Sequence, residues 1–176
     1  DFPQHFPSDF YTKFSYREPL LGWFDAVASN AQAMMDAEIN DAADAGLDYW
    51  AFDDYSYAED VPQNNYFSEL NRAFKLYKSS SVKHRIKFAL AQGAGIASGG
   101  GYVPGYWRTN YVPYLVTQFQ DSQYLKVNGG RPVVFWLGAA DTAANFPNWQ
   151  SDKAYLKQKA LEAGVAEPLF VDTTMD

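Results

Sequence analysis

The fold is decided where a predicted helix gives way to a predicted strand, in Ala42-Ala43-Asp44-Ala45-Gly46-Leu47-Asp48-Tyr49-Trp50-Ala51-Phe52-Asp53. Apolar residues recur at helical spacing before this point, which predicts a helix over residues 31–45. Gly46 ends that helix, because glycine adopts the left-handed backbone that closes many helices. The short aromatic run that follows it predicts a buried strand over residues 47–52.

The same alternation of helix and strand recurs along the rest of the chain. Apolar periodicity predicts further helices over residues 66–77, 110–122 and 151–163. Short apolar runs predict further strands over residues 86–91, 124–127, 133–137 and 168–173. A tight Asn-Gly-Gly turn at residues 128–130 is predicted to join two of these strands. Strands that alternate with helices of this length are typical of parallel sheets with right-handed connections.

The predicted fold class is therefore α/β, of the (β/α)8 TIM-barrel type. A complete barrel takes about 250 residues, whereas this chain has 176. We expect one domain over residues 1–176 that supplies about half a barrel, and the alternative is an open, doubly wound parallel sheet. Because half a barrel leaves strand edges that pair readily, we expect self-association or pairing with the remaining strands of a longer parent chain.

The composition restricts the classes of ligand that suit this chain. Its formal net charge of −7 would repel nucleic acid and anionic membrane surfaces, and no apolar run is long enough to insert across a membrane. The chain has no cysteine, and its two histidines flank different predicted elements, so we expect neither a metal site nor a cofactor. Neutral ligands remain, and aromatic residues make up 18% of the chain, which suits stacking on sugar rings.

Three stretches of the chain carry a resemblance to a known group of enzymes. They are Pro19-Leu20-Leu21-Gly22-Trp23-Phe24-Asp25, residues 42–53, and Tyr124-Leu125-Lys126-Val127-Asn128-Gly129-Gly130-Arg131-Pro132-Val133-Val134-Phe135. In order and spacing they resemble the sugar-active barrels that include glycoside hydrolase families 71 and 99. The resemblance implies an endo-acting hydrolase of a polysaccharide or oligosaccharide. The strand Tyr-Tyr-Pro-Trp-Tyr and the late catalytic glutamates of that group are absent here, so their roles are not carried over.

Two aspartates at predicted strand ends are the candidate catalytic residues. Ligands of parallel barrels bind at the carboxyl ends of the strands, and a glycosidase needs two carboxyl groups, an acid and a base or nucleophile. We predict Asp53 and Asp172 for these roles. Successive residues of a strand point to opposite faces, so only one of Asp53 and Asp54 faces the barrel interior, and we favour Asp53. The alternative is that Asp53 and Asp54 only cap the strand and that Asp172 is structural.

The candidate ligand-binding residues combine aromatic side chains in loops with polar groups at strand ends. Flat aromatic faces stack on the C–H faces of sugars, while a phenol or indole donates a hydrogen bond. The alternative is that half of the aromatic residues pack as core over the barrel mouth. The predicted ligand-binding residues are Trp23, Asp54, Tyr55, Gln92, Tyr102 and Trp107.

The leading hypothesis is a secreted or extracellular carbohydrate-active protein of the glycoside hydrolase type. One alternative is a noncatalytic carbohydrate-binding protein that keeps the aromatic residues without the catalytic glutamates. A second alternative is a structural protein that self-assembles through its exposed sheet edges.

Overall fold

The computed structural model describes residues 10–17, 29–54, 71–93, 107–137 and 149–173. These residues form an α/β fold built on one sheet, which confirms the predicted α/β class. The longer helices are α2 (Ala31–Asp44), α5 (Arg72–Ser79), α6 (Val112–Gln120) and α8 (Trp149–Glu162). The short helical segments are α1 (Phe10–Lys13), η2 (Ser15–Arg17), η3 (Lys83–Arg85) and the π-helix η5 (Trp107–Tyr111). The strands are β1 (Tyr49–Asp53), β2 (Lys87–Gly93), β3 (Lys126–Val127), β4 (Arg131–Leu137) and β5 (Leu169–Thr173).

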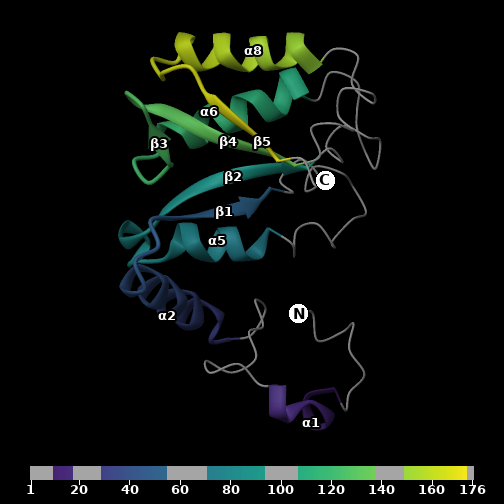
Figure 1. The fold of residues 1–176 in the computed structure, drawn as a ribbon, viewed down its shortest axis with the longest axis vertical. Helices are drawn as coiled ribbons and strands as arrows, with labels where there is room; N and C mark the ends of the chain where they lie inside the picture. The colour runs from purple at the N-terminus through teal and green to yellow at the C-terminus, as the bar shows by residue number, and fades with distance from the viewer. Residues whose placement is uncertain (1–9, 18–28, 55–70, 94–106, 138–148, 174–176) are drawn as a thin grey trace.

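Four strands of the sheet run parallel, in the order β1, β2, β4, β5 (Figure 1). Their register pairs Ala51 with Ala89, Ala91 with Phe135, and Phe135 with Val171. The order across the sheet therefore follows the order along the chain, and each parallel connection contains one of the longer helices. The predicted parallel strands are confirmed.

The first strand starts two residues later than predicted, because the end of α2 takes Leu47 into its cap. Gly46 has a φ of 85°, and its N–H donates to the Ala43 carbonyl at 3.0 Å. The N–H of Leu47 donates to the Ala42 carbonyl, also at 3.0 Å. These two bonds satisfy carbonyls that the end of a helix otherwise leaves free, and β1 begins beyond them.

The predicted helices have different limits in the structure, most of all the second and third along the chain. The helix predicted over residues 110–122 begins earlier, as η5, and then continues as α6. Pro113 lies in the first turn of α6 and has no N–H, which interrupts regular helical bonding where η5 gives way to α6. The helix predicted over residues 66–77 is present as α5, and the residues before position 71 lie outside the described part of the chain.

The Asn-Gly-Gly turn joins β3 to β4 as an antiparallel hairpin, as predicted. Asn128, Gly129 and Gly130 have positive φ angles of 44°, 83° and 93°, a conformation that asparagine and glycine adopt more readily than other residues. Before the turn, the N–H of Leu125 donates to the Phe88 carbonyl at 2.6 Å. The first arm of the hairpin therefore also pairs with the start of β2.

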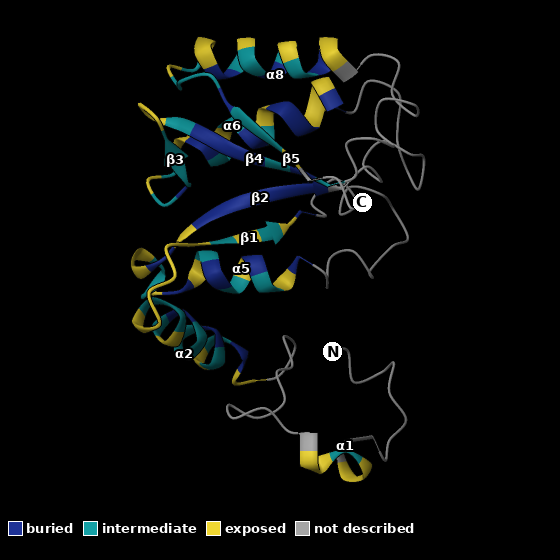
Figure 2. Ribbon diagram, viewed as in Figure 1, coloured by how far each residue is buried: buried dark blue, intermediate teal, exposed yellow. Residues whose placement is uncertain are grey.

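The four longer helices pack on one face of the sheet. The register places Trp50 and Phe52 of β1 on the same face as Phe88 and Leu90 of β2, and β2 is buried over most of its length (Figure 2). These strand residues join a single core cluster with residues of all four helices. The helix residues buried in this cluster include Met35, Ile39, Phe74, Tyr77, Leu115, Phe119, Leu156 and Ala160.

The other face of the sheet is covered by none of the helices of the described chain. The rings of Tyr49 and Phe135 stack there, with centroids 6.0 Å apart and planes inclined by 16°. They meet across β2, where the small side chains of Ala89 and Ala91 leave room for them. An apolar hollow of 620 Å³ lies on this face. Among the described residues, the sheet therefore has one packed face and one face without helices, called the open face below.

The hydroxyl of Tyr124 links β2 to β4, and its removal tests how much this link contributes to stability. Its buried hydroxyl donates to the Val133 carbonyl at 2.8 Å and accepts from the Leu90 N–H at 3.4 Å. We expect Tyr124→Phe to lower the free energy of unfolding by about 1–3 kcal/mol, because buried backbone groups lose a partner. Urea denaturation followed by circular dichroism measures this change. Tyr16→Phe is the control, since Tyr16 is 74% exposed, and equal losses in the two variants would contradict the assignment.

Candidate functional site

The carboxyl end of β1 sends two neighbouring aspartates to opposite faces of the sheet. Asp53 is exposed and lies on the open face, in register with Ala91 of β2. Asp54 is only 3% exposed and lies on the packed face, and its N–H donates to the Ala91 carbonyl at 2.9 Å. The alternation of side chains along a strand accounts for the difference. Of the two residues, Asp53 is therefore the one on the face that a barrel would enclose.

Asp54 belongs to a buried polar cluster with Gln92 of β2 and Tyr111 of η5. The hydroxyl of Tyr111 lies 2.5 Å from Oδ2 of Asp54 and also contacts Oε1 of Gln92. Gln92 and Tyr111 are as deeply buried as Asp54. The cluster therefore connects the ends of two neighbouring strands to the start of a helix.

The proton of Tyr111 decides how the Gln92 amide is oriented. A phenol has one proton to donate, and an ionised carboxylate only accepts, so the Tyr111 hydroxyl donates to Asp54. With Oε1 toward Tyr111, Nε2 of Gln92 would be buried without a partner. The reversed amide, which has nearly the same shape, lets Nε2 donate to the phenol oxygen. We therefore assign a chain of donors from Gln92 through Tyr111 to Asp54.

Burial and the neighbouring carboxylate keep Tyr111 in its neutral form. Burial, followed by the charge of Asp54, raises the pKa of Tyr111 well above its ordinary value. A neutral phenol is the form that can donate to Asp54. Because all three side chains are enclosed, the cluster holds the end of β1 in place and does not itself meet solvent.

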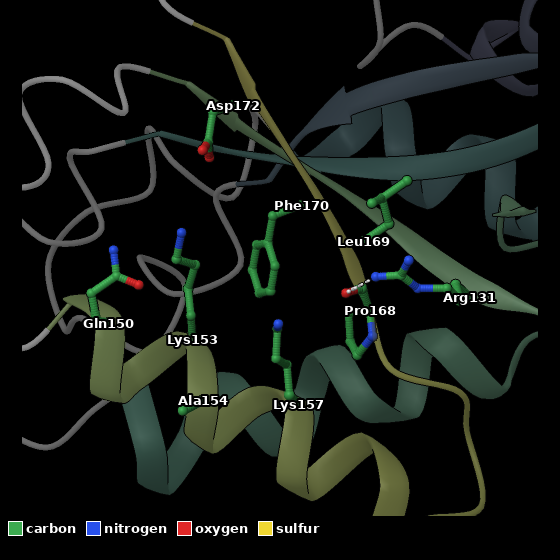
Figure 3. Close-up of a pocket in the computed structure, with 9 residues that line it drawn as sticks. All are labelled: Arg131, Gln150, Lys153, Ala154, Lys157, Pro168, Leu169, Phe170 and Asp172. Carbon is green, nitrogen blue, oxygen red and sulfur yellow. Dashed lines mark hydrogen bonds between the residues drawn. The ribbon is translucent and has the colours of Figure 1, made fainter. Parts of the chain in front are cut away.

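The structure does not bring Asp53 and Asp172 together. Asp172 is in register with Trp136 and lies on the packed face, in the same groove as Lys153 (Figure 3). Asp53 lies on the open face, and two strands separate β1 from β5. At about 4.8 Å for each strand step, the two strands stand roughly 14 Å apart. The prediction that these two residues of one chain form an acid and base pair is corrected by this geometry.

Three predicted ligand-binding residues are buried on the packed face. Trp107 is 5% exposed, with its ring centroid 5.7 Å from that of Trp136, and its indole N–H donates to the Asp152 carbonyl at 3.3 Å. Trp107 is therefore a core residue, which is the alternative left open for the aromatic residues. Gln92 and Asp54 come together at neighbouring strand ends, but on the packed face. Trp23, Tyr55 and Tyr102 lie outside the described residues.

Tyr111 was missed as a functional-site residue, although the sequence contains a signal for it. It precedes Leu115 and Phe119 at four-residue spacing, and all three are buried. Asp54 likewise follows Trp50 and Phe52 at two-residue spacing, which places it on their face. What the sequence does not contain is the register that brings the helix residue and the strand residues together.

Comparisons with known proteins and searches for other kinds of site add no assignment. No family model, curated protein or solved structure matches the chain. Among the described residues, no group of three or more acidic or histidine side chains is placed to hold a metal ion. Within the same residues, none of the helices has both the length and the apolar character needed to cross a membrane.

Tyr111→Phe tests the buried cluster. The substitution keeps the ring but removes the donor to Asp54, which leaves a buried carboxylate without that partner. We expect the free energy of unfolding to fall by about 1–3 kcal/mol, as measured by urea denaturation. Tyr49→Phe is the matched control, because it keeps the ring stacked on Phe135 and removes only the hydroxyl of a residue that is 40% exposed. A Tyr111 variant as stable as this control would contradict the cluster.

Proposed function

We propose that the chain forms half of a (β/α)8 barrel that acts on or binds carbohydrate, of the glycoside hydrolase type, with Asp53 as its sugar-contacting carboxylate. The observation that carries the proposal is the position of Asp53. It is exposed at the carboxyl end of a parallel strand, on the face that bears no helix of the described chain. Ligands of (β/α)8 barrels bind at this end of the strands.

The arrangement of strands and helices supports half a barrel over a doubly wound sheet. A doubly wound sheet reverses its strand order and carries helices on both faces. Here β1, β2, β4 and β5 follow one another without reversal, and the four longer helices contribute to one core cluster. The open face, with Tyr49, Phe135 and Val171, then corresponds to the barrel interior, which side chains of the remaining strands would fill.

Carbohydrate is the ligand class favoured by the sequence. The stretches over residues 19–25, 42–53 and 124–135 resemble sugar-active barrels, and the net charge of −7 favours neutral partners over anionic ones. An exposed carboxylate such as Asp53 accepts hydrogen bonds from sugar hydroxyl groups. In a hydrolase the same group would serve as acid, base or nucleophile.

Noncatalytic carbohydrate binding is the second candidate, and one observation favours it. A glycosidase needs two carboxyl groups at the scissile bond. In the described part of the chain, Asp53 is the one acidic side chain at the carboxyl end of the open face, because Asp54 and Asp172 point to the packed face. One chain, as far as it is described, therefore provides half of the catalytic pair.

Asp53→Asn separates these functions. With neutral polysaccharides and oligosaccharides as probes, we expect this variant to bind about 5- to 150-fold more weakly than wild type, the equivalent of about 1–3 kcal/mol, because the amide removes the charge and replaces one accepting oxygen by a donor. Titration calorimetry measures binding, and release of reducing ends measures hydrolysis. Since Asp53 is exposed, its thermal unfolding should match wild type.

Asp48→Asn is the control for this experiment. Asp48 is also exposed and lies at the opposite end of the same strand, so its variant should behave as wild type. Loss of hydrolysis with binding retained in Asp53→Asn would make Asp53 catalytic. Binding without any hydrolysis in wild type would favour the noncatalytic candidate, and unchanged binding and hydrolysis in Asp53→Asn would refute its role.

A further inference from the structure

Two strands of the described sheet have an unpaired edge. β1 pairs only with β2, and β5 pairs only with β4, among the described strands. The helices nearest these edges, α2 and α8, lie on opposite sides of the sheet in the view of Figure 1. The described residues supply four parallel strands, and eight close a (β/α)8 barrel. In a half barrel of this kind, each of the two edges would pair with a further strand.

The flank of α2 beyond the β1 edge is acidic. The opposite flank faces α5 and η3, where Gln32 donates to the Leu76 carbonyl and Arg85 pairs with Asp44. Glu38 and Asp41, spaced three residues apart, lie on the flank turned away from these contacts. Burial, and then the charge of Asp41, raises the pKa of Glu38. No lysine or arginine of the described chain forms an ion pair with either of these two carboxylates.

The flank of α8 at the β5 edge carries two lysines, Lys153 and Lys157, and is called the basic flank here, although Lys157 also pairs with Glu167 of the same chain at 2.6 Å. The opposite flank faces η5, where Arg108 pairs with Asp152. Lys153 and Lys157 extend from the near flank toward Phe170 of β5 (Figure 3), and the ammonium of Lys153 lies 5.5 Å from the centre of that ring. They line a groove of 420 Å³. The groove residues are Arg131, Gln150, Lys153, Ala154, Lys157, Pro168, Leu169, Phe170 and Asp172.

The geometry points to a second copy of this chain as the occupant of the groove. The α2 helix of one copy lies against α8 of the other, with Glu38 and Asp41 facing Lys153 and Lys157. In the same step, β1 of each copy pairs with β5 of the other. The two contacts are identical under a twofold axis, and four strands from each copy close a ring of eight.

The helix order of a (β/α)8 barrel leads to the same pairing. In that fold each helix lies between the helices that precede and follow it around the ring. The helix that follows α8 in the ring would be the α2 of the second copy, since α2 leads into β1. Its flank turned away from α5 then meets the flank of α8 turned away from α6. These are the acidic and basic flanks described above.

This inference rests on the half-barrel architecture proposed above, and its test uses no carbohydrate, so it can fail independently of the carbohydrate function. Sedimentation velocity over a wide concentration range should give a mass twice the 19.8 kDa of one chain. Lys153→Glu with Lys157→Glu should raise the dimer dissociation constant by about tenfold or more, because like charges then face each other. Glu38→Lys with Asp41→Lys should do the same.

Mixing the two charge-reversed variants is the decisive experiment. In a mixed pair, the reversed α8 flank of one variant meets the reversed α2 flank of the other, and the two native flanks meet at the second contact. Both contacts therefore join opposite charges. A one-to-one heterodimer should form although each variant alone is monomeric. Arg72→Glu with Lys75→Glu, on the exposed surface of α5 away from both edges, makes the same charge change as the first variant and should leave the dimer intact. A monomeric wild type, an open polymer, or a mixture that stays monomeric would overturn the proposal.

Discussion

The alternation of side chains along four strands in one parallel register is the constraint on which the rest of this structure depends. It places Phe52, Leu90, Val134 and Phe170 in one row against the helices. Their neighbours in sequence are turned to the other face, where no helix of the described chain lies. Both faces are largely apolar, although the helices of the described chain bury only one of them. A shift of one residue in this register would exchange the two faces.

The same alternation separates the roles of Asp53 and Asp54. Burying a carboxylate is unfavourable unless hydrogen bonds compensate for the lost water, and Tyr111 provides such a bond to Asp54. Gln92 extends the cluster to the neighbouring strand. The end of β1 is therefore fixed from the packed side, which fixes the direction in which Asp53 leaves the sheet. A support of this kind on rigid elements favours a precisely placed functional group.

Local signals in the sequence predicted the fold class but only part of the candidate site. Helical spacing and the glycine after α2 predicted the alternation of helices and strands, and two-residue alternation predicted that Asp53 and Asp54 face apart. The face occupied by Asp172 depends on the pairing of Phe135 with Val171, which is a contact between distant segments. The burial of Trp107 likewise depends on Trp136, which follows it by 29 positions and lies on another element. Neither of these long-range contacts can be recognised from neighbouring residues in the sequence. The sequence therefore predicted Trp107 as a ligand-binding residue, although it lies in the core.

Closure by a second copy would also supply what one chain lacks for catalysis. In a ring ordered β1, β2, β4, β5 and then repeated, the two copies of β1 stand opposite each other. Both copies of Asp53 would then lie at the same mouth of the barrel, on opposite sides of it. Two carboxyl groups across a barrel mouth are what glycoside hydrolysis requires, with their separation deciding between retention and inversion. The open face, the charged flanks and Asp53, the one acidic side chain of the described chain at the carboxyl end of the open face, would thus be explained together, because each is half of a feature that the twofold axis completes.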